Sequence, residues 1–276
     1  MLRTRSGAIP LDRVAIAGIL NATPDSFSDG GRYTDPGRAA AAAAEMVASG
    51  AALLDIGAES TRPGAGPVPA EEEGRRLLPV LRAVRRAVDV PLSVDTRKAA
   101  IARLALEEGA DLVNDISAGR DDPALLPICA RAGVPVVLMH MQGTPVTMQE
   151  RPHYTDVVAE VSAFLAARAR AAMAAGVARE AIVLDPGIGF GKTVRHNCEL
   201  LRRLDVVVGL GYPVLVGVSR KGFIGALCGG RPTEGRLVGT AAAVALAVAG
   251  GAHLVRVHDV AAMRDVVSVA EAVRGA

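Results

Sequence analysis

Four polar side chains, each at the end of a different apolar segment, could together bind a flat nitrogen heterocycle. They are Asp95, Asn114, Asp185 and Lys221. Two carboxylates, an amide and an ammonium match the alternating donors and acceptors along the edge of such a ring. Each residue taken alone is more simply explained as a helix cap or as packing at a strand end. The set of four predicts a binding pocket for a heterocycle.

The segment from Asp185 to Lys192 (Asp-Pro-Gly-Ile-Gly-Phe-Gly-Lys) could form one wall of that pocket. Its three alternating glycines allow the backbone to approach a flat ligand closely, and Phe190 offers a ring for stacking. Ile116 and Met139 are candidates for the remaining apolar walls. The alternative is a glycine-rich turn capped by an aspartate. The segment matches neither a dinucleotide fingerprint nor a phosphate loop, so nucleotide binding is not supported.

A second group of polar residues could bind an anion. It comprises Asn21, Arg62, Arg256 and His258. Arg256 and His258 are two positions apart on one strand face, where arginine offers a fork for phosphate oxygens and histidine a donor or a proton. Asn21, with Asp25 and Asp29 nearby, could supply oxygen ligands to a Mg²⁺ ion that accompanies a diphosphate. The alternatives are that Arg256 pairs with a neighbouring aspartate and that His258 is structural.

Covalent catalysis and transition-metal chemistry are not indicated. Ser219 and Cys228 have no obvious partnered base, and the nucleophile elbow Gly-x-Ser-x-Gly does not occur. The three cysteines form no Cys-x-x-Cys pair, which argues against a disulfide framework and a zinc site. An odd number of thiols is natural in a reducing cytoplasm.

Eight short apolar segments carry the candidate residues at their ends. The segments are Val14–Leu20, Ala52–Ile56, Pro91–Val94, Asp111–Val113, Pro135–Met139, Ala181–Leu184, Pro213–Val218 and His253–Val257. Stretches with helical spacing separate them, and Asp35-Pro36, for example, is a cap and first-turn proline for a helix that Gly50 would end. This alternation predicts a (β/α)8 TIM barrel, whose active site lies where the carboxyl ends of the strands converge.

The chain has the size and charge of one barrel domain. Its 276 residues, 50% of them hydrophobic, suit a single domain over 1–276 with a core at about 14–273. The net charge of +2 provides no general field for nucleic acid or an acidic membrane. The N-terminus has no signal-peptide pattern, and the apolar stretch Leu237–Val255 is better explained as a buried helix that leads into the last strand.

Three connections are longer than joining two elements requires: Asn21–Asp35, Gly57–Pro69 and His140–His153. Loops of this length in a compact domain are usually functional or disordered. The first two are rich in Gly, Pro, Ser, Thr and Asp, which favours lids that close over a substrate.

Eight motifs of the sequence resemble, in the same order, those of the dihydropteroate synthase family. They are Ile19–Gly31, Glu59–Gly64, Ser93–Thr96, Asn114–Ile116, Leu138–Gly143, Asp185–Lys192, Ser219–Lys221 and Val255–Val260. The resemblance covers residues 14–270. It implies a pterin-binding barrel that condenses 6-hydroxymethyl-7,8-dihydropterin diphosphate with 4-aminobenzoate, giving 7,8-dihydropteroate and diphosphate for folate synthesis. It also implies a cytoplasmic homodimer that uses Mg²⁺ and is a sulfonamide target.

The resemblance also assigns roles by position. The pterin edge would be held by Asp95, Asn114, Asp185 and Lys221, with Met139 and Phe190 against its faces. The diphosphate and metal region would comprise Asn21, Thr61, Arg62, Arg256 and His258. The aminobenzoate site would comprise Phe27, Thr61, Pro63, Ser219 and Lys221.

We expect the reaction to be a dissociative substitution, in which diphosphate leaves before the amine attacks. Its catalytic groups would be Asp95, Asp185, Lys221, Arg256, His258 and Asp29. Cations and Mg²⁺ would stabilise the leaving group, and the carboxylates would stabilise the cationic ring. Asp29, on the first loop, is a candidate for steadying the cation or taking the released proton. The alternatives are a pterin-binding methyltransferase that passes a methyl group to a corrinoid and a pterin-binding paralogue without catalytic activity.

Overall fold

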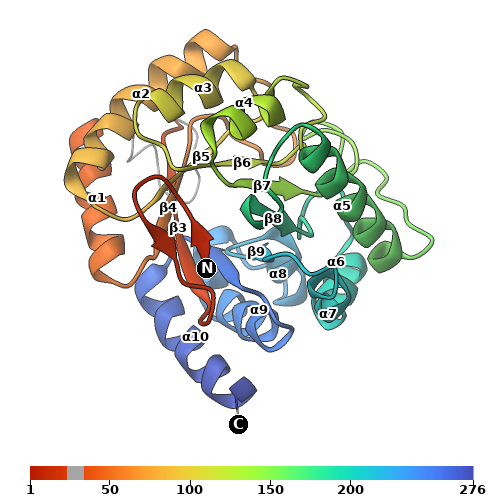
Figure 1. Cartoon of the computed structure of the whole chain (residues 1–276). Coiled ribbons are helices and arrows are strands. Elements are labelled where there is room, and N and C mark those ends of the chain that lie inside the picture. Colours follow the sequence, from red (N-terminus) through yellow and green to blue (C-terminus); the bar gives the residue numbers. More distant parts are fainter. Residues whose placement is uncertain (24–33, 276) are drawn as a thin grey trace.

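Eight parallel strands form the barrel that the sequence predicts. The computed structural model describes residues 1–23 and 34–275. The strands are β3 (Ala15–Asn21), β4 (Leu53–Gly57), β5 (Leu92–Asp95), β6 (Leu112–Asp115), β7 (Val136–Met139), β8 (Ile182–Asp185), β9 (Leu215–Gly217) and β10 (Leu254–Val257). Their order in the sheet is β8-β7-β6-β5-β4-β3-β10-β9, and a bridge between Leu184 and Val214 brings β8 and β9 together (Figure 1). The first and last residues of each strand agree within two positions with those of a predicted apolar segment. The (β/α)8 prediction is therefore confirmed.

Helices surround the barrel, and each buries apolar side chains in the core. They are α1 (Pro36–Ala48), α2 (Ala70–Ala87), α3 (Ala99–Glu107), α4 (Leu125–Ala132), α5 (Val157–Ala174), α6 (Val194–Arg202), α7 (Leu204–Val208), α8 (Gly222–Leu227), α9 (Leu237–Ala249) and α10 (Val260–Gly275). As expected, Asp35 caps α1, and its Oδ1 accepts the N–H of Arg38 at 2.8 Å. The connections after β8 and β9 each contain two helices, so the alternation is not strictly one to one.

The stretch 237–255 forms a helix, a turn and the last strand, as expected, but the helix is buried on one face only, since Val238 and Leu246 are exposed. Its helix is α9, of which Thr240, Ala243, Val244, Ala247 and Val248 are buried. Among the helices described, none combines the length and the apolar character that crossing a membrane requires.

A short hairpin at the N-terminus closes the end of the barrel opposite the carboxyl ends of the strands. Its strands are β1 (Leu2–Arg3) and β2 (Ala8–Ile9), drawn in red in Figure 1. Leu2 and Ile9 are buried against inward-facing residues of the barrel strands, including Leu53, Leu112 and Val183. The hairpin precedes the core expected at about 14–273, and its strands of two residues are too short to show a periodic pattern.

Three residues named from the sequence lie outside the described part of the chain. They are Asp25, Phe27 and Asp29, all on the connection after β3. The roles expected for Phe27 at the aminobenzoate site and for Asp29 in proton transfer therefore stay predictions.

Candidate active site

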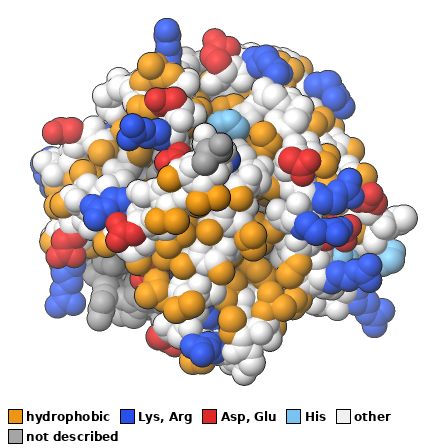
Figure 2. Space-filling model, turned by 90° about the horizontal axis from the view of Figure 1, so that it is seen from below, with side chains coloured by type: hydrophobic (Ala, Val, Ile, Leu, Met, Phe, Trp, Pro, Cys, Tyr) orange, Lys and Arg blue, Asp and Glu red, His pale blue; other side chains and the backbone are white. Residues whose placement is uncertain are grey.

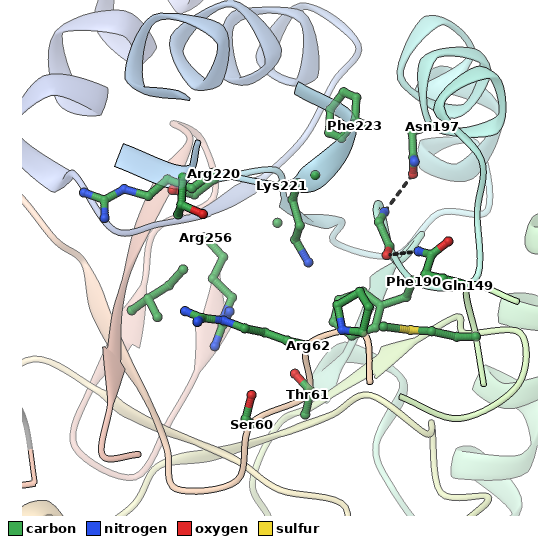
Figure 3. Close-up of a pocket in the computed structure, with 18 of the residues that line it drawn as sticks. Ser60, Thr61, Arg62, Gln149, Phe190, Asn197, Arg220, Lys221, Phe223 and Arg256 are labelled. Atoms are coloured by element: carbon green, nitrogen blue, oxygen red, sulfur yellow. Dashed lines mark hydrogen bonds between the residues drawn. The ribbon is translucent and has the colours of Figure 1, made fainter. Parts of the chain in front are cut away.

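One cavity of about 610 Å³ lies where the carboxyl ends of the strands converge. Ten of the residues named from the sequence line it: Asn21, Thr61, Arg62, Pro63, Asp95, Phe190, Ser219, Lys221, Arg256 and His258. Figure 3 shows Arg62, Lys221 and Arg256 extending into the same space from three different parts of the chain. The other four described candidates, Asn114, Ile116, Met139 and Asp185, are buried at the strand ends beside it. The barrel thus brings all the described candidates together.

A buried ion-pair network joins the heterocycle residues to the anion residues. The Arg256 guanidinium donates to Asp55 through Nε and to Asp95 Oδ2 through Nη2 at 2.9 Å. Asn114 Nδ2 donates to the same Asp55 oxygen at 3.0 Å. The alternative that Arg256 pairs with neighbouring aspartates is therefore correct in this structure. Asp55 was not among the candidates named from the sequence, because it lies inside an apolar strand segment and not at its end.

The two strand-end carboxylates are held in environments that oppose ionisation. Burial raises the pKa of Asp95 to about 7, with Arg256 acting in the opposite direction and Asp55 reinforcing the rise. Burial likewise raises the pKa of Asp185 to about 6, against a hydrogen bond from the Gly187 N–H and the charge of Lys221. Groups whose pKa values move toward neutrality in a cleft are typical of binding and catalytic sites.

An apolar cluster lies beside these carboxylates. It consists of Ile116, Met139, Met141, Met148 and Phe190. The Lys221 Nζ lies over the Phe190 ring, 4.0 Å from its centroid, so the two side chains together line one side of the cavity. The three apolar walls expected from the sequence do come together. Met141 and Met148, from the connection after β7, were not anticipated.

The anion side is a neutral histidine surrounded by cations. The pKa of His258 lies well below its ordinary value because of burial and four nearby charges, those of Arg256, Arg220, Arg62 and Lys221. An uncharged imidazole can still donate a hydrogen bond, and the cations favour any anion that enters. These charges favour binding of an anion such as a diphosphate.

The expectation that Ser219 lacks a partnered base is wrong. His258 Nδ1 lies 2.9 Å from Ser219 Oγ, and the His258 backbone N–H donates to the same oxygen at 3.2 Å. The two residues are 39 positions apart, and adjacent strand ends bring them together, so spacing in the sequence could not show the pair. Within the described residues, no carboxylate accepts from the His258 ring, and Asp259 pairs with Arg220 instead. The pair is therefore no catalytic triad.

Hydrogen bonds hold the connection after β4 at its base and at its tip. This connection carries Thr61, Arg62 and Pro63. Glu59 Oε1 accepts the Val68 N–H at 2.8 Å and so closes the loop on itself. Burial alone would raise the pKa of Glu59, but hydrogen bonds from Arg97, Val68 and Lys98 lower it. At the tip, the Gly64 N–H donates to Pro145 O at 2.9 Å, which joins this loop to the connection after β7.

We expect Glu59→Ala to release this loop. The Val68 amide should then exchange its hydrogen about tenfold faster or more, because its buried acceptor is lost. Hydrogen exchange followed by mass spectrometry measures this directly. Glu72→Ala is the matched control, since Glu72 pairs with Arg75 and Arg76 on an exposed face of α2. Equal exchange at Val68 in both variants would contradict the role given to Glu59.

Asn21 is the only metal ligand predicted from the sequence among the described residues at the cavity. Within residues 1–23 and 34–275, no group of three or more His, Cys, Asp and Glu side chains is arranged to hold a metal ion. Asn21, at the end of β3, lines the same cavity as Arg62 and His258. One amide oxygen fits Mg²⁺ that keeps most of its ligands from water and from substrate phosphates.

Comparison with known proteins agrees with this geometry. Residues 17–258 match the family described as pterin binding enzyme. Dihydropteroate synthase of Synechocystis is 47% identical over 260 residues, which cover 94% of this chain and 90% of that protein. Dihydropteroate synthase of Yersinia pestis, solved with a sulfonamide drug, superposes with a TM-score of 0.96 at 42% identity, covering 100% of this chain and 99% of that one. Dihydropteroate synthase of Xanthomonas albilineans, solved with 7,8-dihydropteroate, gives a TM-score of 0.86 at 46% identity over 97% and 96% of the two chains. The chain belongs to the pterin-binding enzymes and, among them, to the dihydropteroate synthase family.

Proposed function

We propose that this protein condenses 6-hydroxymethyl-7,8-dihydropterin diphosphate with 4-aminobenzoate to form 7,8-dihydropteroate and diphosphate. The observation that carries the proposal is one cavity with two unlike ends. The buried carboxylates of Asp95 and Asp185 lie with the Phe190 ring at one end, and His258 and Arg62 lie at the other. Arg256 and Lys221 carry positive charge between the two ends. A pterin that bears a diphosphate has the same two halves. The Xanthomonas relative holds the product of this reaction.

The residues promote the reaction by placing charge. The bond between the exocyclic methylene carbon and the diphosphate oxygen breaks, and its electron pair leaves on oxygen. Arg62, Arg256 and His258 stabilise that developing negative charge, while Asp95 and Asp185 stabilise the positive charge on the ring. The aniline nitrogen then bonds to the carbon and loses a proton to solvent. An aromatic amine is already neutral at pH 7, so this step needs no strong base.

Arg256 connects the two ends of the cavity. Its Nε and Nη2 are taken up by Asp55 and Asp95, and Nη1 carries further donors that neither carboxylate uses. We infer that this third nitrogen faces the leaving group. Mg²⁺ would travel with the diphosphate, with Asn21 as its protein ligand, and would add positive charge at the leaving oxygens.

The direct test is to mix the purified protein with Mg²⁺, the pterin diphosphate and 4-aminobenzoate, and to measure dihydropteroate and diphosphate. Both products are expected in equal amounts. Binding of the pterin without turnover would favour a non-catalytic paralogue. Methyl transfer from methyltetrahydrofolate to a corrinoid would favour the methyltransferase alternative.

We further propose that the enzyme is a cytoplasmic homodimer. Large apolar side chains are exposed along α9 and α10: Val238, Leu246, Val269 and Val273. Apolar side chains gather on the face shown in Figure 2, which views the molecule from below. α10 also carries charges of both signs, including Arg264, Asp265 and Glu271, which a two-fold interface between identical surfaces can pair. Three unpaired thiols fit a reducing compartment.

A sulfonamide should compete with 4-aminobenzoate and not with the pterin diphosphate. The drug shares the aniline and the para acidic group, but its ring substituent protrudes further. Pro63 lines the cavity on a loop that also holds Thr61 and Arg62, so Pro63→Ala should raise the inhibition constant more than the KM for 4-aminobenzoate. A steady-state inhibition series against each substrate measures both. Competition with the pterin diphosphate would exclude this assignment of the aminobenzoate site.

A further inference from the structure

A buried lysine lies beneath the glycine-rich turn that carries Phe190. Lys192 is 2% exposed, and its Nζ donates to Gly187 O and Phe190 O, both at 2.9 Å. The same nitrogen lies 3.0 Å from His140 Nδ1. His140 O also lies 3.4 Å from this nitrogen. An ammonium has three donors and no acceptor, so when Lys192 is protonated, His140 accepts through Nδ1 and carries its ring proton on Nε2.

Burying the positive charge of Lys192 in the protein interior is energetically unfavourable. Burial lowers the pKa of Lys192 to about 7, although Asp185 opposes the change, and Lys221 adds to it. Burial also lowers the pKa of His140 to about 2, so the imidazole stays neutral beside the lysine. A buried ammonium is weak evidence for stability, because desolvation offsets much of its attraction to its partners.

The turn explains why a donor with several hydrogens is needed. Gly187 O and Phe190 O face the buried interior, where unpaired carbonyls are unfavourable. Gly187 has a φ of 67°, and a Cβ there would lie 1.9 Å from His140 O. The turn is thus pressed against the end of β7. Asn197 and Gln149 hold its outer side through Gly189 (Figure 3).

This turn sets two parts of the heterocycle pocket. It fixes the carbonyl of Phe190, whose ring packs under Lys221. It also fixes the Gly187 N–H, which donates to Asp185 Oδ1 at 2.7 Å. A change in the turn would therefore move the stacking ring and the carboxylate together, while His258 and Arg62 belong to other connections.

We propose that Lys192 is a positioning residue for the pterin end of the cavity, and that its ammonium, seated on His140, holds the Gly187–Phe190 turn in the conformation that binds the ring. This inference rests on the proposed pterin-binding function. Lys192 lines the same cavity, but its Nζ donates to the carbonyls of the turn, so it acts through Phe190 and Asp185.

Lys192→Met tests the inference, because it keeps the chain length and removes the donors. Affinity for 6-hydroxymethylpterin, measured by calorimetry, should fall about tenfold or more. The KM for the pterin diphosphate should rise by a similar factor, while the KM for 4-aminobenzoate and the affinity for inorganic diphosphate should change less than about twofold. Arg195→Met is the matched control, since it removes one exposed positive charge from the start of α6 and should leave every value unchanged.

A second pair of variants covers the case in which Lys192→Met does not fold. His140→Asn keeps an acceptor at the position of Nδ1, and His140→Leu, of nearly equal size, removes it. His140→Leu should bind 6-hydroxymethylpterin more weakly than His140→Asn, by about threefold or more. Equal binding by the two, or equal losses of pterin and diphosphate affinity in Lys192→Met, would overturn the inference. If the unaltered protein fails to bind the pterin at all, the proposed function fails and not the role of Lys192.

Discussion

Replacing Asp185 by Asn is expected to abolish useful pterin binding and to stabilise the folded protein at the same time. Asn offers the ring one acceptor and one donor where the carboxylate offers acceptors only. The loss of a charge-assisted pair in a closed pocket should weaken pterin binding by about 2 to 4 kcal/mol. Calorimetry with 6-hydroxymethylpterin at pH 7.5 measures this loss, and unchanged affinity would contradict the assignment.

The stabilisation follows from the raised pKa of the same carboxyl group. Its pKa is about 6 in the folded protein against an ordinary value of 3.8. Stability from this group is therefore fully present below pH 3.8 and is lost as the pH rises through about 6, so the native protein carries the whole penalty at pH 7. The Asp185→Asn variant has no carboxyl group to ionise and avoids this penalty. Its free energy of unfolding should therefore be higher by roughly 3 kcal/mol at pH 7.

Urea unfolding at several pH values tests that linkage. The advantage of Asp185→Asn should be largest above pH 7 and should shrink as the pH falls from about 6 toward 4. Asp111→Asn is the control, since Asp111 is also buried but accepts from Ser6, Leu92 and Arg85 at the opposite end of the barrel. That variant should lose stability and keep its pterin affinity. A loss of stability in Asp185→Asn at every pH would refute the argument.

Most of the site could be predicted from the sequence, because a barrel brings together polar residues that each end an apolar strand segment. Asp95, Asn114 and Asp185 each end an apolar segment, and the carboxyl ends of parallel strands must converge. No long-range information was needed to group them. The same reasoning placed Arg256 on β10 and His258 directly after the end of that strand.

What the sequence did not reveal depends on contacts between strands or on position within a strand. Asp55 lies in the middle of β4, where a polar residue gives no end signal, yet it joins Asn114 to Arg256. The bond between Ser219 and His258 links two strand ends across 39 positions. Lys192 looked like the end of a motif, and only its hydrogen bonds to Gly187 O and Phe190 O show what it holds.

Arg256→Ala should weaken binding of the pterin diphosphate far more than binding of 6-hydroxymethylpterin, because only the former presents an anion to Nη1. We expect about a hundredfold loss for the diphosphate-bearing ligand. The structure adds a second effect. Asp55 and Asp95 would be left as buried carboxylates without their cation, and the free energy of unfolding should fall by roughly 3 kcal/mol.

Arg256→Lys separates these two effects. A lysine keeps a positive charge beside Asp55 and Asp95, so most of the stability should return. One ammonium lacks the planar fork, however, and should not pair with two carboxylates and an anion together. Affinity for the diphosphate-bearing ligand should therefore stay low in Arg256→Lys while urea unfolding approaches that of the native protein. Arg82→Ala, which breaks an exposed pair with Glu108, is the control for loss of an arginine. Equal losses for the two pterin ligands in Arg256→Ala would mean that Arg256 holds the carboxylates and takes no part in binding the leaving group.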